Sequence, residues 1–269
     1  MARAIQQLSA DSAKKIQWLL TDVDDTLTWR GRLPPETLAS LDRLHRSGIK
    51  VVAVTGACAG WCDHIAKLWP LHGVIGENGA FWMVKNRDGF KTHYAQPLET
   101  MSLRQYQLRE RVQEILDDYP GVDFAADQSY RVCDVAINLS QDREPVDKVV
   151  AQAIAQRIRG LTIDGAPVNA MLSSIHINAW VGEHSKQLSG ESFLRIMAQQ
   201  DNLDLETVTY VGDSHNDESM FAWLPLTFGV NNILAVMDDL THRPDFITDR
   251  NGGYGFSELA ERLLDLRRA

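Results

Sequence analysis

Three aspartates lie within four positions at the end of a short apolar run. Asp22, Asp24 and Asp25 occur in the segment WLLTDVDDTLTWRG, residues 18–31. Like charges this close together disfavour ionisation unless a positive charge lies among them. A polar turn after a strand would explain the three carboxylates, and so would a metal site that contains a carboxylate nucleophile. The other polar residues of the chain decide between these interpretations.

A second acidic strand end occurs late in the chain. In TYVGDSHNDESMF, residues 209–221, an apolar run ends at Gly212 and is followed by Asp213, Asn216 and Asp217. One acidic strand end is a weak signal, but two on strands that can lie side by side offer several carboxylate oxygens to a hard cation. Mg²⁺ prefers a few carboxylates, water and a phosphate oxygen. The pair therefore favours a metal site over two capped turns.

Two further segments contain groups that suit a phosphoryl oxygen. Thr55 ends the apolar run KVVAVT and Gly56 follows it, so that a hydroxyl and backbone N–H groups lie at a strand end. Thr55 could also cap the next helix. Lys186 lies just before an expected helix, where it could balance the carboxylates and hold phosphate as a point charge. By itself it would be an ordinary surface lysine.

The elements expected around these residues alternate between strand and helix. We expect strands at 16–24, 50–57 and from 73 onward, with helices at 34–49 and 58–69. This βαβαβ rhythm predicts a parallel sheet covered by helices on both faces. Ligands bind such sheets outside the carboxyl ends of the strands, which is where Asp22 and Thr55 are placed.

From about Phe81 the pattern changes. Helices are expected at 99–119 and 144–160, and strands at 91–97, 130–140 and 173–180, before the βα rhythm returns after His184. The sequence thus predicts an α/β, Rossmann-like parallel sheet core formed by residues 1–81 and 185–269. An α+β domain, residues 82–184, interrupts this core.

Composition limits the classes of function. The 269 residues are 44% hydrophobic and 23% charged with a net charge of −9, which argues against a nucleic-acid-binding protein. The segment MARAIQQLSADSAKK has no apolar core of signal-peptide length, and no apolar run approaches the roughly 20 residues of a membrane span. We therefore expect a cytoplasmic protein that binds neither nucleic acid nor membrane.

Three cysteines make a disulfide framework improbable. Cys58 and Cys62 are four positions apart, with His64 nearby, and Cys133 is remote from them. A zinc site is conceivable, but a structural site needs four ligands and the sequence offers no convincing fourth. We interpret the cysteines as packing residues.

The polar segments together resemble a known family. DVDDT, VTG, SK and GDSHND, in this order, resemble the four signature motifs of the haloacid dehalogenase superfamily. The insert between the second and third motifs resembles the large α+β cap of subfamily IIB, and GENGA, residues 76–80, resembles the segment that leads into it. FITDRNGGYGFSEL, residues 246–259, is similar to the C-terminal end of sugar-phosphatase members. That group includes trehalose-phosphate and mannosyl-3-phosphoglycerate phosphatases and phosphomannomutases.

The resemblance implies a role for each motif. Asp22 would be the nucleophile that forms an aspartyl-phosphate. Asp24 would protonate the leaving oxygen and then activate water. Thr55 and Lys186 would hold the phosphoryl oxygens. Mg²⁺ would be bound by the backbone carbonyl of Asp24 and by side chains of the other residues of the site. The residues of this metal site would be Asp22, Asp24, Asp213, Asn216 and Asp217.

Two positions depart from the family pattern. Asp25 stands where glycine is frequent, and we interpret it as a tolerated variant. Ala57 and Cys58 stand where an arginine often follows the glycine of the second motif. A possible anion contact near the leaving group is thereby removed, so no substrate preference that depends on it is carried over.

The insert supplies further candidates for contacts with the leaving group. Arg131 and Asp134 are two of them. His176 and Asn178 alternate on SSIHINAW and therefore share a strand face, although an exposed polar sheet face explains them equally well.

Three residues of the expected core are also candidates. Glu77 and Asn78 lie at another strand end and are expected to contact substrate or cap. Trp61 could stack on a sugar or pack in the core.

These observations predict a Mg²⁺-dependent phosphomonoester hydrolase. Its substrate would be a small phosphorylated metabolite, with a sugar phosphate favoured, and the protein would be a monomer or a small homo-oligomer. One alternative is a phosphosugar mutase, which returns the phosphoryl group to another hydroxyl. Another is a metabolite-binding protein with a spent site, which the presence of Asp22, Asp24, Lys186 and Asp213 disfavours.

Overall fold

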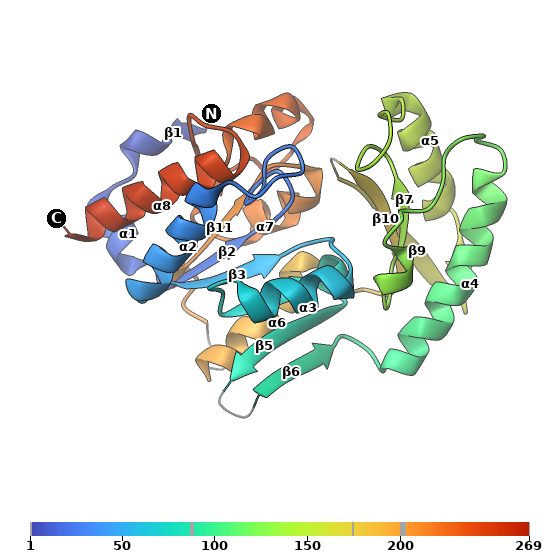
Figure 1. The fold of residues 1–269 in the computed structure, drawn as a ribbon, viewed down its shortest axis with the longest axis horizontal. Helices are drawn as coiled ribbons and strands as arrows, with labels where there is room; N and C mark the ends of the chain where they lie inside the picture. Colours follow the sequence, from blue (N-terminus) through green and yellow to red (C-terminus); the bar gives the residue numbers. More distant parts are fainter. Residues whose placement is uncertain (1, 87–88, 174, 200–202, 269) are drawn as a thin grey trace.

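Two separate β-sheets organise the chain. The structure is a computed structural model that describes residues 2–86, 89–173, 175–199 and 203–268. The larger sheet and its helices form one lobe, which carries both termini, and a smaller sheet with two long helices forms the other (Figure 1). The smaller lobe is contiguous in sequence and interrupts the larger one, as the α+β insert was expected to do.

The larger sheet contains nine strands in the described part of the chain. Neighbouring strands are parallel from β1 to β4, and only β5 runs in the opposite direction, antiparallel to both β4 and β6. In spatial order the strands are β1 (Arg3–Ala4), β13 (Phe246–Ile247), β12 (Thr227–Gly229), β11 (Val208–Gly212), β2 (Trp18–Thr21), β3 (Lys50–Val54), β4 (Gly73–Gly76), β5 (Phe81–Asn86) and β6 (Gly89–Tyr94).

Helices cover both faces of this sheet. One face carries α1 (Ala10–Lys15), α2 (Pro35–Arg46), α3 (Ala59–Leu68) and α8 (Gly252–Arg268), and the other carries α6 (Lys186–Ala198) and α7 (Glu218–Trp223). Successive residues of a strand point to opposite faces. Leu19 of β2 accordingly packs in the first layer, whereas Leu20 packs in the second. The expected α/β fold with helices on both faces is confirmed.

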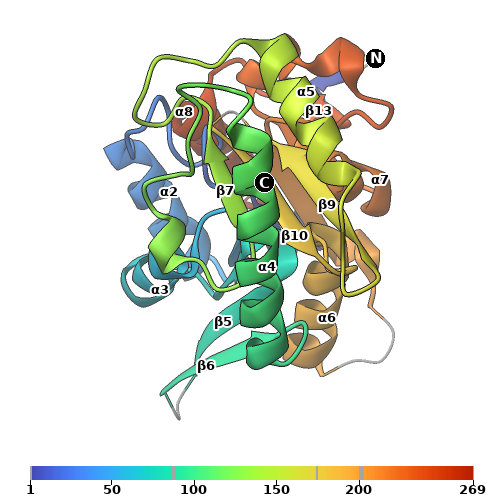
Figure 2. The ribbon, with the colours of Figure 1, turned by 90° about the vertical axis from the view of Figure 1, so that its right-hand side faces the viewer.

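The smaller sheet has one apolar and one polar face. In order it contains β7 (Val135–Asn138), β10 (His176–Val181), β9 (Ala166–Leu172) and β8 (Thr162–Ile163), with antiparallel neighbours throughout. Helices α4 (Leu98–Leu116) and α5 (Lys148–Arg159) pack on the face that contains Ile137, Ile177 and Ala179 (Figure 2). The alternate residues His176 and Asn178 lie on the face turned away from these helices.

The pairing of β5 and β6 bears on where the insert begins. Because β5 and β6 pair within the larger sheet, the expected start at residue 82 falls inside β5. We propose that the insert begins after β6, near residue 95, and ends in the loop before α6. The expected strand at 130–140 is also shorter, since only Val135–Asn138 is extended into β7. None of the described helices is long and apolar enough to cross a membrane.

Candidate active site

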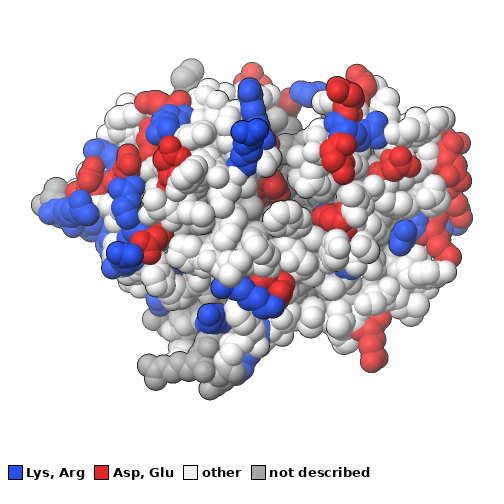
Figure 3. All heavy atoms as spheres, viewed as in Figure 1, with Lys and Arg blue, Asp and Glu red and all other residues white. Residues whose placement is uncertain are grey.

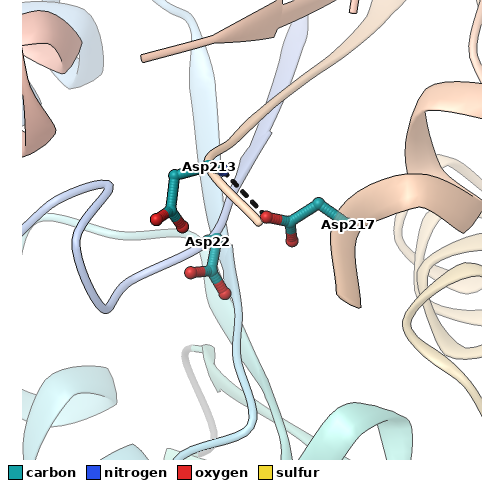
Figure 4. A group of neighbouring side chains, drawn as sticks. All are labelled: Asp22, Asp213 and Asp217. Carbon is teal, nitrogen blue, oxygen red and sulfur yellow. Dashed lines mark hydrogen bonds between the residues drawn. The ribbon is translucent and has the colours of Figure 1, made fainter. Parts of the chain in front are cut away.

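The two acidic strand ends meet at one edge of the larger sheet. Strands β2 and β11 pair in parallel, with Val211 opposite Thr21, so Asp22 and Asp213 leave adjacent strands at the same level. Asp217 follows in the next turn. One carboxylate oxygen from each of these three buried residues lies within 4.8 Å of the others (Figure 4). This is the one such group of potential metal-binding side chains among the described residues.

Lys186 lies inside this cluster. It is the first residue of α6, whose N-terminus is capped by the Ser185 hydroxyl. Its Nζ donates to Asp22 Oδ1 and Asp217 Oδ1, each at 2.7 Å. The side chain is 2% exposed, and the two carboxylates keep it protonated by raising its pKa. A single buried lysine therefore faces three buried carboxylates.

The cluster contains more negative charge than its lysine can balance. Burial raises the pKa of Asp22 to about 8; Lys186 opposes this shift, whereas the charges of Asp217 and Asp24 add to it. Burial and the Asp217 charge also raise the pKa of Asp213 well above its ordinary value. Buried carboxylates in excess of their counter-charges are the donor set that a hard divalent cation prefers. The residues present thus fit a divalent metal ion.

Asp217 is already engaged through both carboxylate oxygens. Its Oδ2 accepts from the backbone N–H groups of Asp213, at 2.9 Å, and Ser214, at 3.1 Å. Its Oδ1 accepts from Lys186 and from the hydroxyl of Tyr210. These contacts hold the turn and the lysine in place, so Asp217 acts on the cluster through its neighbours.

Asp213 and Asn216 are held by other polar contacts. Asp213 accepts from the Thr26 hydroxyl at 3.2 Å and from Asn232 Nδ2 at 2.9 Å. Asn216 lies beside them and accepts from the Ser214 hydroxyl at 2.8 Å. The carboxylate of Asp213 is therefore oriented from both sides.

Asp24 lies at the mouth of the cluster and lines a cavity. Burial, followed by the neighbouring charge of Asp25, raises the pKa of Asp24 to about 6. A carboxyl with this pKa can both give and accept a proton near neutral pH. Asp24 is therefore suited to acid–base chemistry.

Asp25 adopts a left-handed backbone conformation, with φ of +56°. Glycine is favoured in this conformation, and aspartate is one of the few other residues that tolerate it. Its Oδ1 accepts from the backbone N–H of Arg30 at 3.1 Å. The backbone geometry therefore explains why aspartate can replace glycine here.

The second motif lies on the other side of β2. Thr55 is buried at the end of β3, and its hydroxyl accepts from the backbone N–H of Ala57 at 3.0 Å. Gly56 lines the cavity. A Cβ at Gly56 would lie 3.1 Å from Asn78 Nδ2 and 3.3 Å from Asn178 Oδ1. The absence of a side chain at Gly56 thus allows core and cap amides to approach this strand end together.

The cap lies over the strand ends and borders a cavity of about 200 Å³. The polar face of the smaller sheet forms one wall, because His176 and Asn178 line the cavity and are each 3% exposed. Arg131 lines the same wall, and its Nη1 donates to Gly56 O at 3.0 Å. Asp134 lies behind it, accepting from Asn178 Nδ2 at 2.8 Å. The polar sheet face is therefore buried against the core.

Glu77 connects core and cap. Its carboxylate accepts from the backbone N–H groups of Val132, Cys133 and Asp134 in the cap, at 2.7–3.2 Å, and from that of Ala59 in the core, at 3.0 Å. These bonds explain why residues 132–134 do not extend β7. Among the described residues, neither Glu77 nor the buried Asn78 lines the cavity, so the structure places both behind it.

The structure also shows the surroundings of Trp61 and of the three cysteines. Trp61 lines the cavity and is 50% exposed, so it is not a core residue. Cys58, Cys62 and Cys133 are buried and free. In the described chain no group of three or more metal-binding side chains contains a cysteine, so the interpretation as packing residues stands.

Three residues of the cluster were missed by the sequence analysis: Thr26, Tyr210 and Asn232. Asn232 follows the carboxyl end of β12, and the same strand-end argument that selected Asp213 could have selected it. Thr26 lies within the first motif. Tyr210 looks like a core residue of β11, and nothing in its sequence surroundings indicates a polar contact.

Sequence comparisons found a matching family and a related protein. The family of haloacid dehalogenase-like hydrolases matches residues 19–121. A phosphoglycolate phosphatase of Methanobrevibacter smithii is 20% identical over 252 residues, which cover 93% of this chain and 99% of that protein.

Solved structures show the same fold. A Thermoplasma acidophilum protein has a TM-score of 0.67 and 18% identity, covering 93% of this chain and 99% of the other. The sucrose-phosphatase of Synechocystis has a TM-score of 0.64 and 14% identity, covering 92% and 98%.

The fold and the site thus define an α/β core with a cap over its carboxylate cluster. The chain is thus similar to haloacid dehalogenase-like hydrolases and to phosphatases, and these matches support a phosphoric monoester hydrolase.

Proposed function

We propose that this phosphatase hydrolyses a small phosphorylated metabolite, a sugar phosphate, through an aspartyl-phosphate on Asp22 and with Mg²⁺ as cofactor. The observation that carries the proposal is the buried cluster in which Lys186 lies 2.7 Å from Asp22, a residue that lines the cavity under the cap. A carboxylate held this way presents its second oxygen to an incoming phosphorus atom.

The residues of the cluster suit the two halves of the reaction. In the first, Asp22 attacks phosphorus, the ester P–O bond breaks, and the leaving oxygen takes a proton from Asp24. In the second, Asp24 takes a proton from water as this water attacks the aspartyl-phosphate, which releases inorganic phosphate and restores Asp22. Lys186 and Thr55 would orient the phosphoryl oxygens. Phosphoryl transfer depends mainly on such positioning and charge neutralisation.

The donor set supports Mg²⁺ at this place. Asp22, Asp213 and the backbone carbonyl of Asp24 would hold the ion, with Asn216 beside them and Asp217 supporting from behind. When bound, Mg²⁺ neutralises part of the carboxylate and phosphoryl charge. Asp217 is the least suited to direct ligation, because both of its oxygens already accept hydrogen bonds.

A sugar phosphate fits the character of the cavity. Its walls combine polar cap side chains with the rings of Trp61 and Trp69, and such mixed walls suit a molecule with hydroxyl groups and apolar C–H faces. Among the structural neighbours are a sucrose-phosphatase and a protein related to trehalose-6-phosphate phosphatase. These names concern those proteins and support the proposal only by analogy of fold.

The first test is phosphate release from p-nitrophenyl phosphate and from a panel of phosphorylated metabolites, with Mg²⁺ and with EDTA. We expect release only with Mg²⁺. Asp22→Asn should reduce it to background, and Asp24→Asn should lower kcat by about 10²–10⁴-fold because the proton donor is lost.

Asp25→Asn is the matched control, since it removes the same charge from the neighbouring residue and asparagine also tolerates the left-handed conformation. It should retain most of the activity, with a pH profile shifted to lower pH because the charge of Asp25 contributes to the raised pKa of Asp24. Full activity in Asp22→Asn would contradict the nucleophile, and release that is indifferent to EDTA would contradict the metal. Conversion of a sugar phosphate to its isomer without phosphate release would indicate a mutase.

A further inference from the structure

In the part of the chain that the structure describes, the cap wall of the cavity contains no cation that is free to bind an anion. Among the described residues that line the cavity, Arg131 is the only lysine or arginine, whereas Asp22, Asp24 and Asp127 contribute carboxylates. Asp22 and Asp24 belong to the phosphoryl end. At the leaving-group end, the electrostatic character therefore depends on Arg131 and its partners.

The guanidinium of Arg131 is already occupied. Its Nε and Nη2 donate to the two carboxylate oxygens of Asp127, at 3.1 and 3.0 Å. Its Nη1 donates to Asp134 at 2.9 Å and to Gly56 O at 3.0 Å. The side chain is fully buried, so water does not screen these pairs. Two carboxyl groups paired with one guanidinium leave no unpaired positive charge in this group of three residues.

His176 adds no positive charge to this wall. Burial, together with the charge of Arg131, lowers the pKa of His176 to about 4, so the imidazole is neutral at physiological pH. Its Nε2 is buried and has no hydrogen-bond partner among the described residues. A buried polar atom without a partner is unfavourable, and a ligand hydroxyl would satisfy it.

The opposite wall is apolar and aromatic. Trp61 and Ile65 of α3, together with Trp69 at the end of this helix, line the cavity across from the polar cap face. An aromatic wall suits the C–H face of a polyol or sugar ring. The remainder of the leaving group would then meet hydroxyl-binding groups and no free cation.

We propose that the leaving group is an uncharged polyol, and that phosphate esters with a second anionic group are rejected because Arg131 is neutralised by Asp127 and Asp134. This inference rests on the proposed phosphatase activity and specifies the class of its substrate. A carboxylate or second phosphate would lie against paired carboxylates, and like-charge juxtaposition in a desolvated site is costly. A bisphosphorylated intermediate, which a mutase requires, would meet the same obstacle.

Matched pairs of substrates test the inference. Glycerol 3-phosphate is compared with 3-phosphoglycerate, and glucose 1-phosphate with glucuronic acid 1-phosphate, because each pair differs by a hydroxymethyl group and a carboxylate. We expect kcat/KM to favour the uncharged member by about tenfold or more, which corresponds to about 1.4 kcal/mol. Compounds that are not turned over are compared as competitive inhibitors of p-nitrophenyl phosphate hydrolysis, where the same preference is expected.

The variant Asp127→Asn tests whether the preference for uncharged substrates depends on the pairing of Arg131 with Asp127. Asparagine removes one of the two compensating charges but can still accept a hydrogen bond, so the preference within each pair should fall by about tenfold. Asp164→Asn is the control, since it removes the same charge from an exposed turn of the cap with φ of +50°, which asparagine tolerates. It should leave activity and preference unchanged.

The possible results distinguish a failure of the inferred preference for uncharged leaving groups from a failure of the proposed phosphatase activity. Mg²⁺-dependent hydrolysis of p-nitrophenyl phosphate without any preference for the uncharged members overturns the inference and leaves the phosphatase intact. A preference that Asp127→Asn does not alter overturns the role of the Arg131 pairs. Absence of Mg²⁺-dependent release from every compound, p-nitrophenyl phosphate included, contradicts the proposed function itself.

Discussion

At the scale of single residues, Asp22 and Asp213 destabilise the metal-free fold. Their raised pKa values mean that ionising them costs more free energy in the folded chain than in the unfolded one. Thr26, Asn232 and Lys186 reduce this cost without abolishing it. Without a bound cation, the mutual repulsion of these carboxylates lowers the free energy of unfolding.

The stability of the metal-free protein should therefore fall as the pH rises. Between the ordinary pKa of 3.8 and the folded value of about 8 for Asp22, the folded state binds more protons than the unfolded state, so the unfolding free energy decreases with pH. In EDTA at pH 8, Asp213→Asn should raise the melting temperature by about 2–4 °C for each kcal/mol of repulsion removed, although it abolishes activity.

Asparagine at this position can accept from Asn232 and donate to the Thr26 hydroxyl, so both contacts of Asp213 can be kept. Thermal unfolding of the wild type and the variant at pH 5 and pH 8, with EDTA and with Mg²⁺, measures the effect. The difference should be small at pH 5 and should disappear or reverse with Mg²⁺. A variant that is less stable than the wild type at pH 8 in EDTA would refute the argument.

At the scale of elements, one carboxylate of the core, that of Glu77, accepts from three backbone N–H groups of the loop before β7. Glu77 has φ of +44° and Asn78 has φ of +54°. A left-handed conformation is unfavourable for a residue such as glutamate, and four backbone N–H groups compensate for it. Because this loop begins at Arg131, the position of the guanidinium depends on Glu77 without any contact between Glu77 and the cavity.

Glu77→Gln should loosen this connection. Glutamine keeps one acceptor oxygen but turns an NH₂ group toward backbone donors, so the unfolding free energy should fall by about 1–3 kcal/mol. KM for metabolite substrates should rise more than KM for p-nitrophenyl phosphate, which depends less on the cap. Urea denaturation and steady-state kinetics measure the two effects.

Glu114→Gln is the matched control, because Glu114 is an exposed residue of α4 that pairs with Arg111. Surface pairs of this kind contribute little, so the control should behave like the wild type. Equal effects of the two substitutions would show that the Glu77 contacts do not hold the cap.

At the scale of the whole molecule, the cap has a hydrophobic core of its own. Leu108 and Val112 of α4 and Ile154 of α5 pack with Ile177 of β10 in a cluster separate from those of the larger sheet. A contiguous segment with its own core is what defines an independently folding domain. On the one face that Figure 3 shows, acidic side chains predominate along the outer edge of the right-hand lobe, whereas basic and acidic side chains are mixed on the other lobe.

The isolated segment 95–183 should therefore unfold cooperatively. Its melting, followed by circular dichroism, should be a single sigmoidal transition. The variant Ile177→Asp, which places a charge in the cap core, should abolish this transition and serves as the control. A gradual, non-cooperative change in the unsubstituted segment would show that the cap requires the core to fold.

The central strands and the acidic strand ends were predictable from local sequence. Buried parallel strands are continuous apolar runs, and the residues that follow them meet at one edge of the sheet, which is why Asp22, Thr55 and Asp213 could be selected without a structure. The hairpin of β8 and β9 was missed, although Asp164-Gly165, both with positive φ, is a recognised turn signal.

The partners of buried charges could not be predicted in this way. Glu77 appeared suited to contact substrate or cap, and only the fold shows that its oxygens are used by residues 132–134. Arg131 and Asp134 were both candidates for binding, but their mutual ion pair removes the free charge from each. Such pairings depend on the docking of cap on core, which no local pattern encodes.

The interrupted order of the core has a consequence for the order in which the protein folds during synthesis. The central strand β2 pairs with β3 on one side and with the late strand β11 on the other, and Lys186 follows Asp22 by 164 residues. The cap is complete before either arrives. We therefore expect the nascent chain to form the cap first while β2 keeps one edge unpaired, a state in which exposed apolar strands favour aggregation. The carboxylate cluster then assembles last, when the closing strand inserts beside β2.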